Sequence, residues 1–330
     1  MKLLVTGGLG FIGSNFIIHI LRDYDDFEII NLDAEMDGSN HDNLREIEKS
    51  ERYRFVKGNI TNRKLLDELI PQVDCVVNFA AESHVDRSIA DPNPFLISNF
   101  RGVFTILEAL KKNKKKFIQI STDEVFGTIK EGSATELTRF NPSSPYAATK
   151  ASAELLINAY VVTYNIEAII TRCTNNYGPR QFFEKLIPKT ISLSMNKKSI
   201  PVYGKGDSIR DWIFVEDHCK AIMLVIKNGI CGETYNISAI NEINNLQIVN
   251  NILKIVGGSQ ELIKFVASRP GEDTRYSLDS TKIREELGWK PEVTFEEGIK
   301  KTIEWYKSNE NCGIDTGNKV FSETPWKNKD

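Results

Sequence analysis

The sequence of 330 residues predicts an α/β protein with a doubly wound parallel sheet and a smaller, discontinuous C-terminal domain. Two observations predict this class. Short apolar runs alternate with helical periodicity up to about residue 172, and a glycine-rich turn follows the first run directly. Such alternation is typical of parallel sheets covered by helices on both faces. After Cys173 the pattern changes to loops and short elements, which indicates a second region.

The periodicity predicts the individual elements of the first region. Strands are expected at Leu3–Thr6, Glu28–Leu32, Tyr53–Lys57, Cys75–Phe79, Phe117–Ser121 and Ala168–Arg172. Helices are expected at Phe11–Leu21, Asn62–Ile70, Phe95–Lys112 and Tyr146–Tyr164.

A helix at Val215–Lys227 and a strand at Glu233–Ile237 are expected to return to the first domain. The first domain then comprises residues 1–174 and about 215–240, and the second comprises about 175–214 and 241–330. Loops are expected at Asn175–Pro179, Pro201–Gly204 and Arg269–Asp273. Helices near Asn245–Val256, Ser280–Leu287 and Phe295–Tyr306 would cover a small substrate pocket.

The turn after the first strand is the signature of a Rossmann-type nucleotide-binding unit. Gly7, Gly10 and Gly13 permit a tight turn, close approach of a pyrophosphate to the backbone, and tight packing of helix on strand. Asp33 ends the second strand, twenty residues after Gly13. Because an acid there accepts hydrogen bonds from ribose hydroxyls and repels a 2′-phosphate, the sequence predicts NAD rather than NADP.

Two groups of reactive side chains lie between Ile120 and Lys150. Tyr146 and Lys150 are one helical turn apart on one face, so the ammonium can lower the phenol's pKa and hold a nicotinamide ribose. This pair indicates a base for hydride transfer. Asp123 and Glu124 are unnecessary for that step alone, but an acid and a base beside one sugar allow loss of a proton and of water. Together the two groups indicate dehydration.

The reactive residues and the cofactor residues are expected to meet in one crevice. Ligands of such sheets bind at the carboxyl ends of the strands. The residues that follow the predicted strands are Asp33, Asn59, Ala80, Ala81 and Ser121–Glu124.

Composition excludes several other classes. The net charge is −3, and the one basic run, Lys111–Lys116, falls where a helix should end, so nucleic acid is not an expected partner. The four histidines lack the spacing of metal ligands, so no metal site is predicted. The sequence also has no run of about eighteen apolar residues, so no membrane span is predicted. Five cysteines without close pairs, and a first strand that starts at Lys2, predict a soluble, unexported protein of the reducing cytoplasm.

The motifs resemble the extended short-chain dehydrogenase/reductase superfamily and, within it, the nucleotide-sugar 4,6-dehydratases, above all those acting on dTDP-glucose. The resemblance covers nearly the whole chain. The glycine turn and the tyrosine–lysine pair mark the superfamily, whereas Ala80–Ser88 and the triplet Thr122-Asp123-Glu124 mark the dehydratases. The further matching segments are Arg172–Pro179 and Arg210–His218.

The resemblance implies an NAD-dependent lyase of deoxysugar biosynthesis, as in the dTDP-rhamnose pathway, that forms a 4-keto-6-deoxy sugar. Tyr146, with Lys150 and Thr122, would take the proton of the sugar 4-hydroxyl while C4 is oxidised. Glu124 would remove the C5 proton, and Asp123 would protonate the departing 6-hydroxyl. The implied NAD contacts are Gly7, Gly10, Phe11, Ile12, Gly13, Asp33, Asn59, Ile60, Ala80, Ala81, Ser121, Tyr146 and Lys150.

The implied partner is a nucleotide-diphosphate sugar. The matching positions are Ser83, Arg87, Thr122, Asn175, Lys185, Leu186, Pro201, Tyr203, Arg210, Asn245 and Arg269. Arginine suits a diphosphate because its fork makes paired charge-assisted bonds, although Arg210 beside Asp211 also fits a structural ion pair.

Three positions depart from the family pattern. Asn59 replaces an aspartate that accepts from the adenine amino group, and Glu272 replaces a histidine near the expected diphosphate. The segment Asp33–Gly38 also lacks the usual threonine and tyrosine. These departures leave UDP-glucose open as the substrate. A nucleotide-sugar 4-epimerase, which lacks the Asp-Glu pair, and a non-catalytic dinucleotide sensor, which loses the tyrosine or lysine, are the competing functions.

The resemblance also implies a homodimer in which two helices of each chain pair across a two-fold axis. The helices at Phe95–Lys112 and Tyr146–Tyr164 carry apolar residues beyond what one sheet face can cover. We expect these to be exposed in the single chain: Phe100, Phe104, Leu107, Leu155 and Ile157.

Overall fold

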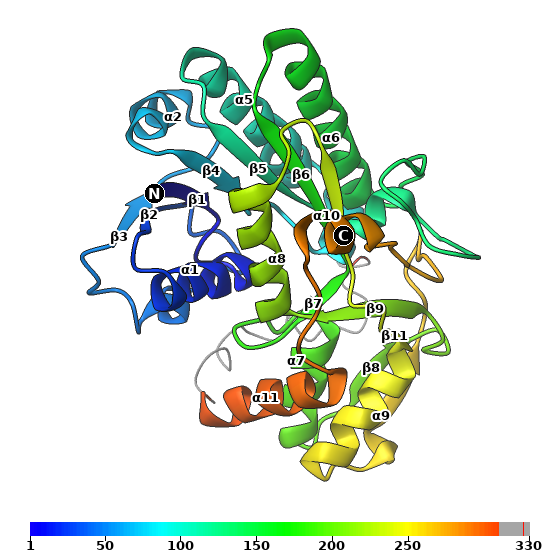
Figure 1. The fold of residues 1–330 in the computed structure, drawn as a ribbon. Helices are drawn as coiled ribbons and strands as arrows, with labels where there is room; N and C mark the ends of the chain where they lie inside the picture. Colours follow the sequence, from blue (N-terminus) through cyan, green and yellow to red (C-terminus); the bar gives the residue numbers. More distant parts are fainter. Residues whose placement is uncertain (310–325, 327–330) are drawn as a thin grey trace.

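The structure is a computed structural model that describes residues 1–309 and Trp326 (Figure 1). Cys312 and the end of the second predicted domain lie outside the described residues. Within the described part of the chain, no helix has both the length and the apolar character needed to cross a membrane.

A parallel sheet of seven strands forms the centre of the larger region, in the order β10-β6-β5-β4-β1-β2-β3. The predicted doubly wound fold is therefore confirmed. The strands are β1 (Lys2–Thr6), β2 (Glu28–Asp33), β3 (Tyr53–Lys57), β4 (Cys75–Asn78), β5 (Lys116–Thr122), β6 (Ala168–Cys173) and β10 (Thr234–Ile237). The apolar side chains of the other six strands are buried on both faces, as parallel strands require, whereas those of the edge strand β3 are partly buried.

Helices cover both faces of this sheet (Figure 1). On one face α1 (Phe11–Asp23) packs beside α8 (Val215–Asn228), with Phe16 and Ile222 in the core between them and the sheet. The other face carries α2 (Arg63–Leu69), α5 (Val103–Lys112) and α6 (Pro145–Tyr164), with Leu66, Ile106 and Ile157 in the core.

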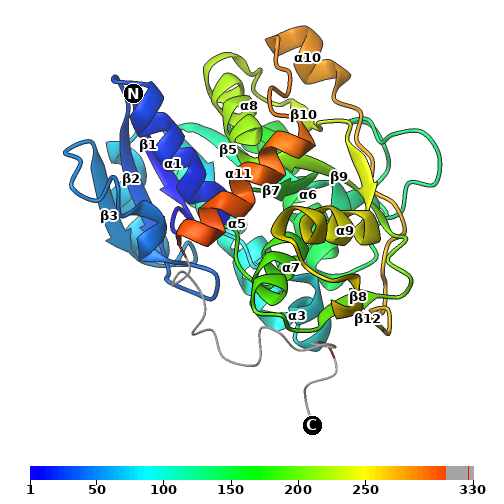
Figure 2. The ribbon, with the colours of Figure 1, turned by 90° about the horizontal axis from the view of Figure 1, so that it is seen from below.

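The second region has its own core below the carboxyl ends of the strands (Figure 1). Its strands are β7 (Asn175–Tyr177), β8 (Ile200–Tyr203), β9 (Ile209–Phe214), β11 (Glu242–Asn244) and β12 (Ile263–Val266), which form the small sheets β11-β9-β7 and β12-β8. Around them lie α7 (Leu186–Met195), α9 (Asn245–Val256) and α11 (Phe295–Ser308), close together when seen from below (Figure 2). The region is more regular than expected, because the predicted loops at Asn175 and Pro201 contain β7 and β8.

The helix expected at Phe95–Lys112 is not one regular helix. A short α4 (Asn93–Phe95) leads into a π-helical segment, Leu96–Gly102, and only then into α5. At the centre of the π segment, buried Asn99 accepts from Glu82 N at 2.9 Å and donates to Glu82 O at 2.9 Å. This side chain therefore ties the irregular turn of the helix to the segment after β4.

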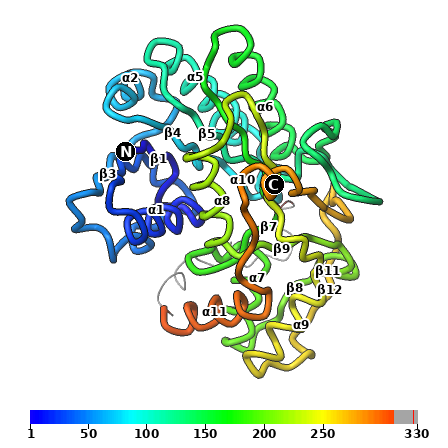
Figure 3. Tube along the Cα trace, viewed as in Figure 1, coloured from blue at the N-terminus to red at the C-terminus, as the bar shows by residue number. Residues whose placement is uncertain are grey.

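The expectation that α10 (Thr281–Leu287) covers a substrate pocket is wrong. It lies near α8 (Figure 3) and packs against α8 and β10 instead. Ile283 is part of the large core, and Lys282 Nζ donates to Thr234 O at 3.0 Å. The helix therefore closes the edge of the seven-stranded sheet.

Two of the five apolar side chains expected at the surface are buried. Leu107 and Ile157 are 0% exposed because they face the sheet and pack in its core. Phe100, Phe104 and Leu155 are exposed, at 36%, 43% and 59%, together with Leu96 and Val162 on the same helical segments.

Candidate active site

A cavity of about 320 Å³ lies at the carboxyl ends of β1, β2, β4, β5 and β6. Every residue that the sequence predicted for NAD lines it: Gly7, Gly10, Phe11, Ile12, Gly13, Asp33, Asn59, Ile60, Ala80, Ala81, Ser121, Tyr146 and Lys150. The predicted acid–base residues Thr122, Asp123 and Glu124 line it too, with Ser83, Arg87, Asn175 and Lys185. We name it the dinucleotide cavity.

A second cavity, of about 170 Å³, lies between α3 (Val85–Ala90) and the second region, and we name it the sugar cavity. The remaining residues predicted for substrate line it: Leu186, Pro201, Tyr203, Arg210, Asn245 and Arg269. Glu124, Asn175 and Lys185 line both cavities, so the two adjoin at the predicted base.

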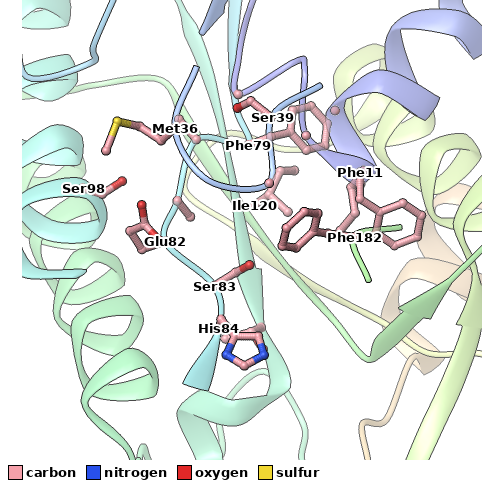
Figure 4. Close-up of a pocket in the computed structure, with 18 of the residues that line it drawn as sticks. Phe11, Met36, Ser39, Phe79, Glu82, Ser83, His84, Ser98, Ile120 and Phe182 are labelled. Carbon is pink, nitrogen blue, oxygen red and sulfur yellow. The ribbon is translucent and has the colours of Figure 1, made fainter. Parts of the chain in front are cut away.

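The walls of the dinucleotide cavity come from distant segments (Figure 4). Phe11 from the start of α1 and Phe182 from the second region lie on one side. Met36, from the loop after β2, and Ser98, from the π-helical segment, lie on the other, and Ile120 of β5 lies between the two sides.

The geometry of the glycine turn fits a dinucleotide. Gly7 has φ +71°, and a Cβ there would lie 2.6 Å from Ala80 N. A Cβ at Gly13 would lie 2.4 Å from Gly7 O, so neither position accepts a side chain. Among the described residues, no side chain caps the N-terminus of α1, which leaves its backbone N–H groups and positive dipole facing the cavity.

Asp33 holds this turn in place. Its Oδ2 accepts from Leu9 N at 3.0 Å, and its Oδ1 accepts from Glu35 N and Ser39 Oγ at 2.8 Å each. The carboxylate therefore fixes the glycine turn and the following loop while it lines the cavity. Asn59 also lines the cavity, but its Oδ1 accepts from Thr61 N at 2.9 Å and Thr61 Oγ1 at 2.8 Å.

The turn that follows β5 presents two carboxyl groups in different surroundings. Asp123 is buried, and its Oδ1 accepts from Thr122 Oγ1 at 3.1 Å. Its Oδ2 is buried without a partner among the described residues. Burial, and next the charge of Glu124, raise the pKa of Asp123 well above its usual range. Burial also raises the pKa of Glu124, while Arg269, Lys185 and Arg210 oppose that rise.

Tyr146 and Lys150 lie on one face of α6, as predicted, but the expected lowering of the phenol's pKa is not found. Burial raises the pKa of Tyr146 well above its usual range, the Glu124 charge adds to that, and a hydrogen bond with Thr122 opposes it. Lys150 Nζ donates to Ile120 O at 2.6 Å. In this arrangement desolvation is the largest influence on the pKa of the phenol.

Several predicted substrate residues already have partners in the protein. Arg87 Nε donates to Glu184 Oε1 at 2.9 Å, and its Nη1 is paired with Asp37. Lys185 Nζ donates to Ser83 O at 2.9 Å. These contacts tie the second region to the walls of the dinucleotide cavity.

Arg210 does not form the ion pair with Asp211 that its position allowed. Its Nη1 donates to Ile209 O and its Nη2 to Asp273 O, each at 2.8 Å, and the guanidinium lies 4.3 Å from the ring centre of Tyr276. Asp211 instead accepts from Ser238 and from Asn241 N. The guanidinium of Arg210 thus stays at the wall of the sugar cavity.

The structure adds residues that spacing alone did not single out. Buried Asp86 accepts from Tyr203 Oη at 2.8 Å and from Arg269 Nη1 at 3.1 Å, so it holds two walls of the sugar cavity. His84 and Glu184 line both cavities, and Tyr276 lines the second. The dehydratase-like motif contains His84 and Asp86, and Glu184 precedes Lys185, but no sequence signal marked Tyr276.

The described residues contain no cluster of three or more histidine, cysteine, aspartate or glutamate side chains able to hold a metal ion. The fold and the two adjoining cavities define the class of protein. It is a dinucleotide-binding enzyme fold with a Tyr–Lys pair and a second cavity that is rich in arginine and lysine.

Comparison with known proteins narrows this class. The family model described as GDP-mannose 4,6 dehydratase matches residues 4–302. The chain belongs to this family. It is 47% identical to the low-salt glycan biosynthesis protein Agl12 of Haloferax volcanii, over 93% of this chain and 98% of the relative. It is 43% identical to dTDP-glucose 4,6-dehydratase 1 of Escherichia coli, over 94% and 93% of the two chains.

Among solved structures, the fold is similar to that of DesIV, the dTDP-glucose 4,6-dehydratase of Streptomyces venezuelae crystallised with NAD and TYD bound. The TM-score is 0.93 and the identity 42%, covering 95% of this chain and 99% of that one.

Proposed function

We propose that the protein is an NAD-dependent lyase that converts dTDP-glucose to dTDP-4-keto-6-deoxyglucose. The observation that carries this proposal is the position of Glu124. It lies where the two cavities adjoin, next to a buried acid and close to the Tyr146–Lys150 pair. An acid, a base and the Tyr146–Lys150 pair thus surround one point, as oxidation followed by elimination requires.

The residues lining the dinucleotide cavity are proposed to hold NAD. The glycine turn and the uncapped end of α1 suit the pyrophosphate, and Asp33 suits the adenosine ribose. Bound NAD would supply the oxidant for C4 and, after elimination, the reductant for C6. Lys150 would bind the nicotinamide ribose, and Ser121 and Ala81 would line the same end of the cavity.

Tyr146 is proposed to take the proton of the 4-hydroxyl as the C4–H bond breaks. Thr122 supports this role because its hydrogen bond is the contact that lowers the phenol's pKa. The charged Lys150 would stabilise the phenolate form of Tyr146, which accepts this proton and becomes the neutral phenol. Formation of the 4-ketone makes the neighbouring C5–H bond acidic.

Glu124 is then proposed to remove the C5 proton, and Asp123 to donate a proton to the 6-oxygen. The C6–O bond breaks, water leaves, and a C5–C6 double bond forms. Reduction at C6 and return of a proton to C5 would then give the 4-keto-6-deoxy sugar. The buried position of Asp123 fits the role of proton donor, because burial disfavours its charged form and raises its pKa. Glu124 faces Arg269, Lys185 and Arg210, which favour its ionised form.

The basic residues of the sugar cavity are proposed to bind the diphosphate. Arg210 and Arg269 supply the guanidinium groups, and Asn175, Lys185 and Asn245 supply further polar contacts. Pro201 and Tyr203 would contact the base, while Ser83, Thr122 and Leu186 would contact the sugar side. Arg87 is proposed to act through its pairs with Glu184 and Asp37 at the boundary of both cavities.

UDP-glucose is the alternative substrate for the same chemistry. The observation that leaves this alternative open is Glu272, which departs from the family pattern, lines the sugar cavity and accepts from Ser208 Oγ at 3.1 Å.

Incubation with dTDP-glucose and with UDP-glucose, followed by mass analysis, tests the proposal. We expect loss of one water from the dTDP sugar; a 4-epimer without mass change, or no turnover of either sugar, would contradict dehydration.

The two regions are proposed to divide the work between them. Residues 1–174 and about 215–240 would bind NAD, and about 175–214 and 241–330 would bind the nucleotide sugar. The pairing of β10 with β6 supports the return of the chain to the first domain. The separate core of β7, β9, α7, α9 and α11 supports the second, and α10 is its one described helix that packs on the large sheet.

A homodimer is proposed to form through α5, α6 and the π-helical segment. These helices carry exposed apolar residues that pairing across a two-fold axis would cover: Leu96, Phe100, Phe104, Leu155 and Val162.

Residence in the cytoplasm is also proposed. The free thiols of Cys75, Cys173, Cys219 and Cys231 support a reducing compartment.

A further inference from the structure

Glu154 is a buried carboxylate that none of the steps above uses. It lies on α6, one helical turn after Lys150, and is 0% exposed. Its Oε2 accepts from Arg172 Nε at 2.9 Å and Arg172 Nη2 at 2.8 Å, and its Oε1 accepts from Ser121 Oγ at 2.5 Å. A charge buried so completely requires partners of this kind.

Glu154 and Lys150 hold consecutive residues of β5. Lys150 Nζ donates to Ile120 O at 2.6 Å, and Ser121, which donates to Glu154, follows directly. Ser121 lines the dinucleotide cavity and precedes the Thr122-Asp123-Glu124 turn. One face of α6 is therefore attached at two successive points to the strand that carries the acid–base residues.

The partner charge of Glu154 is held away from the cavity. Arg172 belongs to β6, and its guanidinium lies 4.9 Å and 5.1 Å from the ring centres of Phe126 and Phe140. Its Nη1 also donates to Glu136 O at 3.1 Å. Unlike Lys150, Arg172 does not line the dinucleotide cavity.

The ionisable groups that act most on Lys150 are Glu154 of its own helix and Cys173 of β6. Tyr146 of the same helix, and Asp123 and Glu124 of the turn after β5, line the dinucleotide cavity together with Lys150. Burial lowers the pKa of Lys150 to about 8, and Glu154 is the largest influence in the opposite direction. Without Glu154, desolvation would act on the ammonium almost unopposed.

We infer that Glu154 is a positioning residue that keeps Lys150 charged and holds the end of β5 against α6 through Ser121. Its effect on catalysis rests on the proposed function, because a charged Lys150 matters there for binding the nicotinamide ribose and stabilising the phenolate of Tyr146. Its effect on Lys150 itself needs no substrate. The two claims can therefore be tested separately.

The direct test is the titration of Lys150 by NMR in protein labelled with ¹³C at lysine Cε. The Lys150 signal is identified by its loss in Lys150→Arg. In Glu154→Gln we expect the midpoint to fall by roughly one to three pH units, the range typical when an opposite charge is removed from a neighbouring site. Glu154→Asp keeps the charge and should leave the midpoint near that of the unmodified protein. An unchanged midpoint in Glu154→Gln would overturn the inference.

Two further variants separate this effect from loss of structure. Glu242→Gln removes the carboxylate of the Arg275 pair on β11 and should not move the Lys150 midpoint. If Glu154→Gln does not fold, the double variant Glu154→Leu/Arg172→Met leaves no unpaired buried charge. Its Lys150 midpoint should still fall, by less than in the single variant, and an unchanged midpoint there also refutes the inference.

The catalytic part is tested on the first step alone, as reduced nicotinamide formed in a single turnover with dTDP-glucose. The alkaline limb of this rate should move to lower pH in Glu154→Gln by the same amount as the Lys150 midpoint. A shifted NMR midpoint with no turnover by the unmodified protein would refute the proposed function and leave the inference standing. Normal turnover by the unmodified protein, with an unshifted Lys150 midpoint in Glu154→Gln, would support the proposed function and refute the inference.

Discussion

Asp123 and Glu124 are adjacent in the chain but lie in different surroundings. Glu124 lies on the wall shared by the two cavities, whereas Asp123 is buried with one carboxyl oxygen unpartnered among the described residues. Desolvation raises the pKa of both carboxyl groups. Arg269, Lys185 and Arg210 oppose this rise at Glu124, whereas Arg210 is the one positive charge that opposes it at Asp123 among the main influences. Environments that separate two carboxyl groups in this way assign one as acid and the other as base.

The first prediction separates oxidation from elimination. Glu124→Gln removes the C5 base and leaves Tyr146 and Lys150 in place, so reduced nicotinamide and a 4-keto sugar should accumulate without net dehydration. Tyr146→Phe should block the first step, with little reduced nicotinamide and no exchange of the C5 hydrogen. Each should lose about 10²–10⁴-fold in product formation. The measurement is single-turnover absorbance with mass analysis. If neither variant forms reduced nicotinamide, Glu124 is not a separate elimination base.

The second prediction concerns pH. A base works only above its pKa, and burial raises the pKa of Glu124. C5 exchange with deuterated solvent should therefore decline, as the pH falls, at a higher pH than an exposed glutamate of pKa about 4.3 would give. Mass spectrometry across a pH series gives the midpoint of this decline directly. A midpoint at the pKa of an ordinary glutamate would contradict the role of Glu124 as the base.

A third prediction uses Asp123 to link stability with function. Its folded-state pKa lies above its unfolded value, so the stability that it contributes is present at low pH and is lost as the pH rises through the window above its ordinary pKa. Asp123→Asn removes the buried ionisable group. It should therefore abolish the elimination while leaving the Tm at alkaline pH equal to or above that of the unmodified protein. A large drop in Tm would show that the carboxylate is instead needed for folding.

The fourth prediction concerns the cofactor. Purified protein should carry NAD, because the cofactor is oxidised and reduced within one turnover, and it should prefer NAD to NADP. Asp33→Asn keeps an acceptor for Leu9 N but removes the charge, so the preference should narrow by on the order of tenfold, or about 1.4 kcal/mol. Binding of both dinucleotides by calorimetry measures it. An equal preference in both proteins would argue against charge repulsion at Asp33.

The fifth prediction tests the proposed dimer. Leu155→Asp places a charge on the exposed apolar face of α6 and should convert the dimer to single chains at micromolar concentration. Leu137→Asp is the matched control, since Leu137 is 96% exposed but lies outside α5 and α6. Sedimentation gives the mass. A single-chain mass for the unmodified protein, or dissociation by both variants, would contradict the proposed interface.

The sequence by itself determined the sheet, the glycine turn and the family. Local signals were sufficient because apolar runs, helical periodicity and glycines express constraints of neighbouring residues. The strands from β1 to β6 lie within two residues of their predicted bounds, and the predicted NAD residues all line one cavity. The order of parallel strands brings their carboxyl ends together, so motifs far apart in the chain could be assigned to one crevice.

Only the tertiary structure decided how the side chains are partnered. Spacing placed Lys150 beside Tyr146, but the Lys150 ammonium donates to Ile120 O. Burial is the largest influence on the pKa of the Tyr146 phenol. Likewise, Leu107 and Ile157 look alike in sequence to the exposed Phe104 and Leu155, yet they face the core. Desolvation, ion pairing and the direction of a helix face depend on segments distant in sequence, such as β6 with Arg172 beside Glu154 on α6. No local pattern contains that information, because those contacts exist only after the chain has folded.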